Sequence, residues 1–178
     1  MLMKERAENV QAIVSKISSF YDACRYTVEL TRHQKGENIS APDLAEKEHD
    51  IIRNSCKGTG INLLANPLNP KNVGIHTSLT RAQWGIAETG TLVLNSHSED
   101  IRIATMLAEI HVAILPAENI RPDAESLVHE LSAVLESDTP SYTAFITGAS
   151  RTSDIERVLT IGVHGPRELH ILIIGDEA

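Results

Sequence analysis

The spacing of apolar residues along the chain predicts three amphipathic helices. The first covers residues 8–21, where apolar side chains recur at helical intervals, namely Val10, Ile13, Val14, Ile17 and Tyr21. The second opens at Ser40, with Pro42 and Asp43 in its first turn, and ends near Gly58. The third begins at Pro122 and carries one apolar face: Ala124, Leu127, Val128, Leu131, Val134 and Leu135. Residues 26–34 fit either a helix or a strand.

Short apolar runs between these helices predict strands over 61–64, 73–75, 91–94, 111–115, 142–147 and 169–174. The run that starts at His111 is almost continuously apolar until Pro116, which is typical of a parallel strand buried on both faces. A helical turn is expected through Leu79, Ala82 and Trp84, and a helix over 98–109. Strand, helix and strand from 111 to 147 predict a right-handed crossover.

Length and charge exclude several classes of protein. A chain of 178 residues with 42% hydrophobic content suits one globular domain, 1–178. The formal net charge of −8 argues against a nucleic-acid surface and against an anionic membrane. No apolar run approaches the roughly 20 residues that span a bilayer. The first residues lack the apolar core of a signal peptide, so a cytoplasmic location is expected.

The cysteines and histidines do not predict a resident metal. Cys24 and Cys56 are the only cysteines, whereas an iron–sulfur cluster needs about four thiolate ligands. The eight histidines include no pair at helical spacing with a carboxylate. We therefore expect reduced thiols and no cofactor bound by this chain alone.

A glycine turn before the strand at 91–94 carries the first candidate site. In the stretch GIAETGTLVL, residues 85–94, the carboxylate of Glu88 stands beside Thr89, Gly90 and Thr91. Ligands of α/β proteins collect at strand ends, where loops expose backbone N–H groups beside catalytic side chains. Glu88 is therefore a candidate catalytic residue, and the alternative is that it only caps the turn.

A second glycine turn lies in FITGASRTSDIE, residues 145–156. Here Gly148 and Ser150 precede Arg151, and Ser153 with Glu156 has the spacing of a capping box that starts a helix over 154–161. A helix amino terminus binds anions, and an arginine adds a bidentate clamp for a carboxylate or phosphate. The alternative is an ordinary helix start, with Arg151 paired to a nearby acid.

Three further residues are candidates. His164 lies between glycines in GVHGPRELH, residues 162–170, and an unperturbed imidazole titrates near neutrality, which suits proton transfer. Arg102 on the helix at 98–109 is a candidate ligand-binding residue, and a buried ion pair with a glutamate is its structural alternative. His111 either points into the site or is satisfied within the core.

These stretches, together with RIATMLAEIH at residues 102–111, closely resemble the lactate utilization protein C family, also called the LUD domain. The resemblance covers about residues 73–176 and leaves residues 1–60 as a mainly helical amino-terminal part. It implies a Rossmann-like, mostly parallel sheet with flanking helices, related to the sugar-phosphate isomerase and CoA-transferase group. It also implies a role in the oxidation of L-lactate to pyruvate beside two iron–sulfur partner proteins.

Three hypotheses on function stay open. In the first, a pathway subunit binds a small carboxylate or anionic ligand through Arg151, the 148–150 turn and His164, while Glu88 handles a proton. In the second, Glu88 serves a self-contained enzyme as nucleophile or base, with the 89–91 amides as an oxyanion site. The third is a non-catalytic module that senses a carboxylate. The sequence is compatible with a homo-oligomer without determining one.

Overall fold

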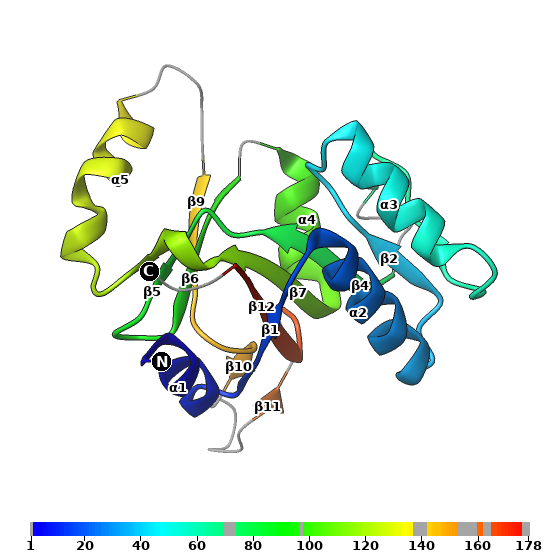
Figure 1. Ribbon diagram of the computed structural model, residues 1–178, viewed down its shortest axis with the longest axis horizontal. Coiled ribbons are helices and arrows are strands. Elements are labelled where there is room, and N and C mark those ends of the chain that lie inside the picture. Colours follow the sequence, from blue (N-terminus) through cyan, green and yellow to red (C-terminus); the bar gives the residue numbers. More distant parts are fainter. Residues whose placement is uncertain are drawn as a thin grey trace.

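The computed structural model describes residues 2–69, 74–96, 98–136, 142–152, 160–161 and 165–175. Within them the chain forms a main six-stranded sheet and a second, four-stranded sheet, with helices around both (Figure 1). The helices are α1 (Leu2–Asn9), α2 (Phe20–His33), α3 (Glu46–Cys56), α4 (Glu99–Leu107) and α5 (Val128–Leu135). The strands are β1 (Ala12–Ile17), β2 (Asn38–Ser40), β3 (Asn62–Leu63), β4 (Ile75–Arg81), β5 (Trp84–Ile86), β6 (Thr91–Ser96), β7 (Ala108–Pro116), β8 (Ile120–Arg121), β9 (Tyr142–Ile146), β10 (Arg151–Thr152), β11 (Thr160–Ile161) and β12 (Glu168–Ile174).

The main sheet is parallel throughout, in the order β1-β12-β7-β4-β2-β3. β7 and β12 are neighbours near its centre, with Leu169 opposite His111. This confirms the predicted α/β fold with a mostly parallel sheet and flanking helices. The apolar run at 111–115 is therefore a strand buried on both faces, as its composition predicts, and the run at 169–174 is the predicted last strand.

The second sheet has the order β8-β5-β6-β9, with β6 antiparallel to both β5 and β9. The predicted right-handed crossover from residues 111–115 to 142–147 is therefore wrong, because β7 and β9 belong to different sheets. The burial of β9 gives the physical reason. None of the five residues of β9 is fully buried, which suits an edge strand of an antiparallel sheet rather than a central parallel strand.

The two sheets and their helices form successive layers. Ile110, Val112 and Ile114 point from β7 toward α2 and α3, in a core with Leu79 and Ile52. The alternate residues of β7 point toward the second sheet, where Ala113 and Leu115 share a core with Leu92 and Leu94. Leu127 and the α5 residue Leu131 pack on the outer face of the second sheet. Figure 1 shows α2 and α3 on one side of the molecule and α5 on the other.

The amino-terminal part differs from the predicted helix over 8–21. α1 ends at Asn9, Gln11 adopts a left-handed φ of 67°, and β1 then joins the edge of the main sheet. The β-branched residues Ile13, Val14 and Ile17 fit a strand as well as a helix, and pairing with β12 decides between them. Residues 26–33 are helical because they belong to α2, whose N-cap is Ser19; the Ser19 hydroxyl accepts from the Asp22 amide.

Other helices and strands also differ from the predicted ones. Ser40 ends β2 instead of opening a helix, and α3 starts at Glu46 after the left-handed Asp43. The helical turn expected through Leu79 is wrong, because that segment is β4, which is paired on both sides. The third predicted helix begins as a 3-10 turn at residues 125–127. The predicted short strand at 61–64, the helix at 98–109 and the strands at 91–94 and 142–147 are confirmed.

The predicted capping box and most of the predicted helix over 154–161 lie outside the described residues. The last two residues of that helix, 160–161, are β11, which pairs antiparallel with β10. None of the helices in the described part of the chain is long and apolar enough to cross a membrane.

Two glycine turns hold the second sheet against the amino-terminal segment. Gly90 has a φ of +67°, and a Cβ added there would lie 2.3 Å from the Ala7 backbone nitrogen. Gly148 has a φ of +74°, and its Cβ would lie 2.1 Å from the Val10 carbonyl oxygen. Only glycine accommodates both the left-handed backbone and this close approach.

We expect Gly90→Ala to destabilise the fold more than Gly58→Ala. Both glycines are left-handed, but a Cβ at Gly58 would meet nothing within 4 Å. Gly58→Ala should cost about 1 kcal/mol of backbone strain, and Gly90→Ala about 2 kcal/mol more, because the Ala7 backbone must move. Urea unfolding midpoints measure the difference. Equal losses would show that the contact with α1 is not tight.

Candidate functional site

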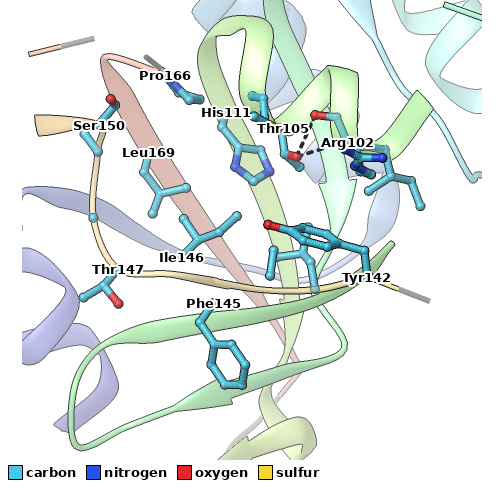
Figure 2. A pocket seen from close by; sticks show the side chains of 17 residues that line it. Arg102, Thr105, His111, Tyr142, Phe145, Ile146, Thr147, Ser150, Pro166 and Leu169 are labelled. Carbon is cyan, nitrogen blue, oxygen red and sulfur yellow. Dashed lines mark hydrogen bonds between the residues drawn. The ribbon is translucent and has the colours of Figure 1, made fainter. Parts of the chain in front are cut away.

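A cavity of about 320 Å³ opens between the two sheets, beside the amino ends of β7 and β12. Its walls come from α4, β7, β9, the turn after β9 and the start of β12 (Figure 2). Segments around residues 102–111, 142–150 and 165–169 thus meet at one place, although they are far apart in the sequence. The volume falls in the range of small-molecule sites.

Arg102 supplies the positive charge of the cavity. Among the described residues that line it, Arg102 is the one arginine or lysine, and none is a carboxylate. Its guanidinium lies 2.8 Å from Glu99 and 5.4 Å from the centre of the Tyr142 ring. The ion pair with Glu99 is exposed, and such pairs contribute about 1 kcal/mol or less, so an anionic ligand can compete for Arg102. Arg102 is not in a buried ion pair.

The helix α4 presents Arg102 together with three neighbours at helical spacing, Ile101, Thr105 and Met106. The Thr105 hydroxyl donates to the Ile101 carbonyl at 2.9 Å and retains lone pairs that can accept. Our sequence reasoning missed Thr105. The helical period that predicts α4 was the signal that could have found it.

His111 lies in the wall of the cavity and is 1% exposed. Its Nε2 lies 2.7 Å from the Thr80 hydroxyl on the neighbouring strand β4. Burial, and to a smaller extent the nearby His170, lowers the pKa of His111 to about 4. The imidazole is therefore neutral at pH 7. It can exchange a hydrogen bond with a ligand, but it does not neutralise a carboxylate.

Hydroxyl groups gather at the other end of the cavity, around the glycine turn after β9. Thr147 and Ser150 line this end, and the Ser150 amide donates to the Pro166 carbonyl at 2.8 Å. The Thr147 hydroxyl lies 2.8 Å from that of Thr91, which lies 2.7 Å from that of Thr89. This chain of hydroxyls links the turn after β5 to the wall of the cavity.

The structure brings together part of the predicted site. Arg102, His111, Gly148 and Ser150 line the cavity, and Thr91 contacts it through Thr147. The other predicted residues that the structure describes are not among the lining residues: Glu88, Thr89, Gly90 and Arg151. His164 lies outside the described residues. The ligand-binding and catalytic roles of all these residues stay predictions.

Glu88 and Arg151 are exposed, each on a short turn or strand. The Glu88 amide donates to the Pro122 carbonyl at 2.9 Å, so this amide holds the turn after β5 in place. Arg151 starts β10 and pairs in register with Ile161. Gly90 packs against α1, which gives its conformation a structural reason.

Tyr142 and Thr147 are lining residues that our sequence reasoning missed as well. Tyr142, Ala144 and Ile146 alternate along β9 and therefore share the face that points into the cavity, whereas the Phe145 side chain points away from it (Figure 2). This two-residue period was visible in the sequence, but the facing direction depends on the pairing of β9 with β6.

A family model for the LUD domain matches residues 1–174. The chain belongs to the LUD domain family. This confirms the resemblance that the four motifs carry, and it extends the match of this LUD protein to the amino-terminal part.

Curated relatives match over part of their length. The lactate utilization protein C of Geobacillus thermodenitrificans is 37% identical over an alignment of 111 residues, and the match covers 59% of this LUD protein and 43% of the relative. That of Anoxybacillus flavithermus is 36% identical over 98 residues, 55% and 43% of the two chains. An uncharacterized protein of Neisseria meningitidis serogroup B is 35% identical over 100 residues, 56% and 42% of the two chains. The matches span less than half the length of these relatives.

A solved structure shares the fold of this LUD protein. It is the crystal structure of a DUF162 family protein from Deinococcus radiodurans, with a TM-score of 0.64 and 17% sequence identity. The alignment covers 98% of this chain and 94% of that chain. At this identity the likeness shows the fold alone.

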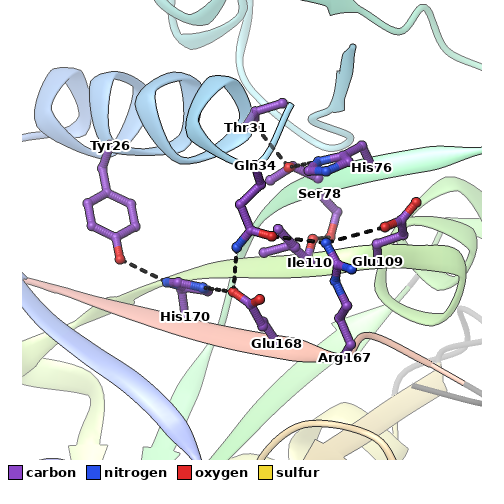
Figure 3. A network of polar contacts seen from close by, with 11 residues as sticks. Tyr26, Thr31, Gln34, His76, Ser78, Glu109, Ile110, Arg167, Glu168 and His170 are labelled. Carbon is purple, nitrogen blue, oxygen red and sulfur yellow. Dashed lines mark hydrogen bonds and ion pairs between the residues drawn. The ribbon is translucent and has the colours of Figure 1, made fainter. Parts of the chain in front are cut away.

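A second polar cluster lies on the opposite face of β12 from the cavity (Figure 3). His170 is buried between the Tyr26 hydroxyl, at 2.8 Å from Nδ1, and the Glu168 carboxylate, at 3.0 Å from Nε2. The Gln34 side-chain amide donates to the same carboxylate at 2.8 Å. Burial lowers the pKa of His170, and the bond to Glu168 opposes this shift. The cluster ties α2 to the main sheet of this LUD protein.

Both cysteines are buried thiols in the core under α2 and α3. Burial raises the pKa of Cys24 to about 12, so its thiol is protonated at neutral pH. The described residues contain no group of three histidine, cysteine, aspartate or glutamate side chains that could hold a metal ion.

We expect His111 to make the LUD protein less stable in acid. An unfolded histidine titrates near pH 6.5, and His111 in the fold titrates near pH 4. Between these two pH values a proton binds to His111 in the unfolded state but not in the folded state. The contribution of the neutral His111 to the free energy of unfolding is therefore fully present above pH 6.5 and is lost as the pH falls toward 4. The loss is on the order of 3 kcal/mol.

Urea unfolding of the wild type and of His111→Gln at pH 7 and pH 4.5 measures this effect. The wild type should lose more stability between the two pH values than the variant, which lacks the titrating group. Identical losses in both proteins would show that His111 is not desolvated in the fold.

Proposed function

We propose that this chain is a lactate-utilization-type LUD protein that binds a small carboxylate at Arg102. In this proposal it acts with iron–sulfur partner proteins in the oxidation of L-lactate to pyruvate. The similarity to lactate utilization protein C from two bacteria supports the pathway. The side chains that line the cavity support a small carboxylate as the ligand.

One observation carries the choice of ligand. In a chain of net charge −8, the cavity between the sheets is lined by an arginine and by no described carboxylate. A guanidinium binds a carboxylate through two parallel hydrogen bonds. The Tyr142 ring lies beside Arg102, and Thr105 follows it on the same face of α4. These two side chains limit the directions from which an acid can approach Arg102.

The electrons of the reaction would leave through the partner proteins. Conversion of L-lactate to pyruvate releases two electrons and two protons, and this sequence has two cysteines where a cluster needs about four ligands. We therefore assign the iron–sulfur clusters to the partners. In this proposal the LUD protein binds and orients the acid, and the partner proteins accept the electrons.

Paired arginine variants test the ligand site. Arg102→Gln should weaken the binding of pyruvate and L-lactate about tenfold or more, because a hydrogen bond to a charged group contributes about 1.5–3 kcal/mol. Arg151→Gln is the matched control, since its side chain is exposed outside the cavity. Isothermal titration calorimetry of the purified chain measures the dissociation constants.

Two results would contradict the proposal in different ways. Loss of binding in Arg151→Gln or Glu88→Gln, with Arg102→Gln unaffected, would move the site to the two glycine turns and favour the enzyme that uses Glu88. Failure of the wild-type chain to bind either acid would count against carboxylate binding altogether.

A further inference from the structure

The polar groups of the cavity are separated along its length. Figure 2 shows Arg102 and Tyr142 toward one end and Thr147 and Ser150 toward the other, with the apolar Ile146 and Leu169 and the His111 imidazole between them. A three-carbon acid held at Arg102 would leave the hydroxyl end unoccupied. The volume of about 320 Å³ also corresponds to a larger ligand.

The middle of the cavity is apolar. Leu94, Ile101 and Leu169 form one wall and are almost fully buried, whereas Ala144 and Ile146 on β9 and Met106 on α4 keep part of their apolar surface exposed. Covering this exposed apolar surface with methylene or ring carbons of a ligand is favourable, and a polar acid gains nothing from it.

The end of the cavity away from Arg102 suits an uncharged polar group. The side chains at this end are those of Thr147, whose hydroxyl lies 2.8 Å from that of Thr91, and Ser150. The His111 imidazole lies between the two ends, and its Nε2 is 2.7 Å from the Thr80 hydroxyl. No described lysine or arginine lines this end to balance a second negative charge. A buried carboxylate without such a partner costs several kcal/mol.

We infer that the cavity prefers a monocarboxylate with an elongated apolar body, with or without a hydroxyl or keto group at its far end, over a three-carbon acid. This inference rests on the proposed function, because it takes Arg102 as the carboxylate site. It adds that lactate or pyruvate fills one end of a larger site, and that acids of about six to eight carbons fill the whole of it.

Titration calorimetry with unbranched monocarboxylates from propionate to octanoate tests the inference. Burial of one methylene should tighten binding about fourfold, so the dissociation constant should fall at each step until the cavity is full. Adipate, which has a second carboxylate, should bind at least tenfold more weakly than hexanoate. An affinity independent of chain length, or adipate equal to hexanoate, would overturn the inference.

A filled cavity provides the second measurement. Ala144→Leu places a larger side chain inside and should abolish the gain from propionate to hexanoate while propionate still binds. Thr143→Leu is the matched control, because Thr143 lies on the opposite face of β9 and should leave the gain unchanged. A gain that persists in Ala144→Leu would show that the long acids bind elsewhere.

The binding measurements distinguish a failure of this inference from a failure of the proposed function. If pyruvate and lactate bind through Arg102 and longer acids bind no more tightly, only this inference is wrong. If no monocarboxylate binds, the proposed function is wrong as well.

Discussion

The close approach of two glycine turns to the amino-terminal segment is the contact on which the site depends. Gly90 lies against the backbone of Ala7, and Gly148 against the carbonyl of Val10. Both turns belong to the second sheet, and both contacts lie at or after α1, just before β1 enters the main sheet. Because backbone meets backbone, the distance between the sheets is fixed without a flexible side chain. The space that remains between the sheets, next to Ile146 and Leu169, is the cavity.

This arrangement explains why the site has an apolar body and few charges. A cavity between two packed sheets inherits the side chains of their inner faces, which are apolar because they form the core elsewhere. His111 is on such a face, and its desolvation follows from its place in β7 rather than from any specific partner. Arg102 escapes the same penalty because α4 holds it at the edge, where water reaches the guanidinium.

Sequence patterns correctly predicted features that depend on a single helix or strand. They failed for features that depend on the pairing or packing of two elements. The apolar run after His111 predicted a central strand, and the period of residues 98–109 predicted α4 and thereby the position of Arg102. Residues 12–17 satisfied the helical and the strand period at once, and their partner strand β12 lies more than 150 residues further along the chain. The separation of Glu88 from Arg102 likewise depends on β5 and β6 forming a second sheet. No local pattern contains that information.

The central claim is that a carboxylate binds in the cavity between the sheets and not at the turn that carries Glu88. Amide chemical shifts of the isotope-labelled chain, followed during a titration with pyruvate, test it most directly. The account predicts the largest changes around Arg102 and Thr105 on α4 and along residues 144–150, with little change at residues 87–89. Changes concentrated at residues 87–89, with α4 unaffected, would contradict it.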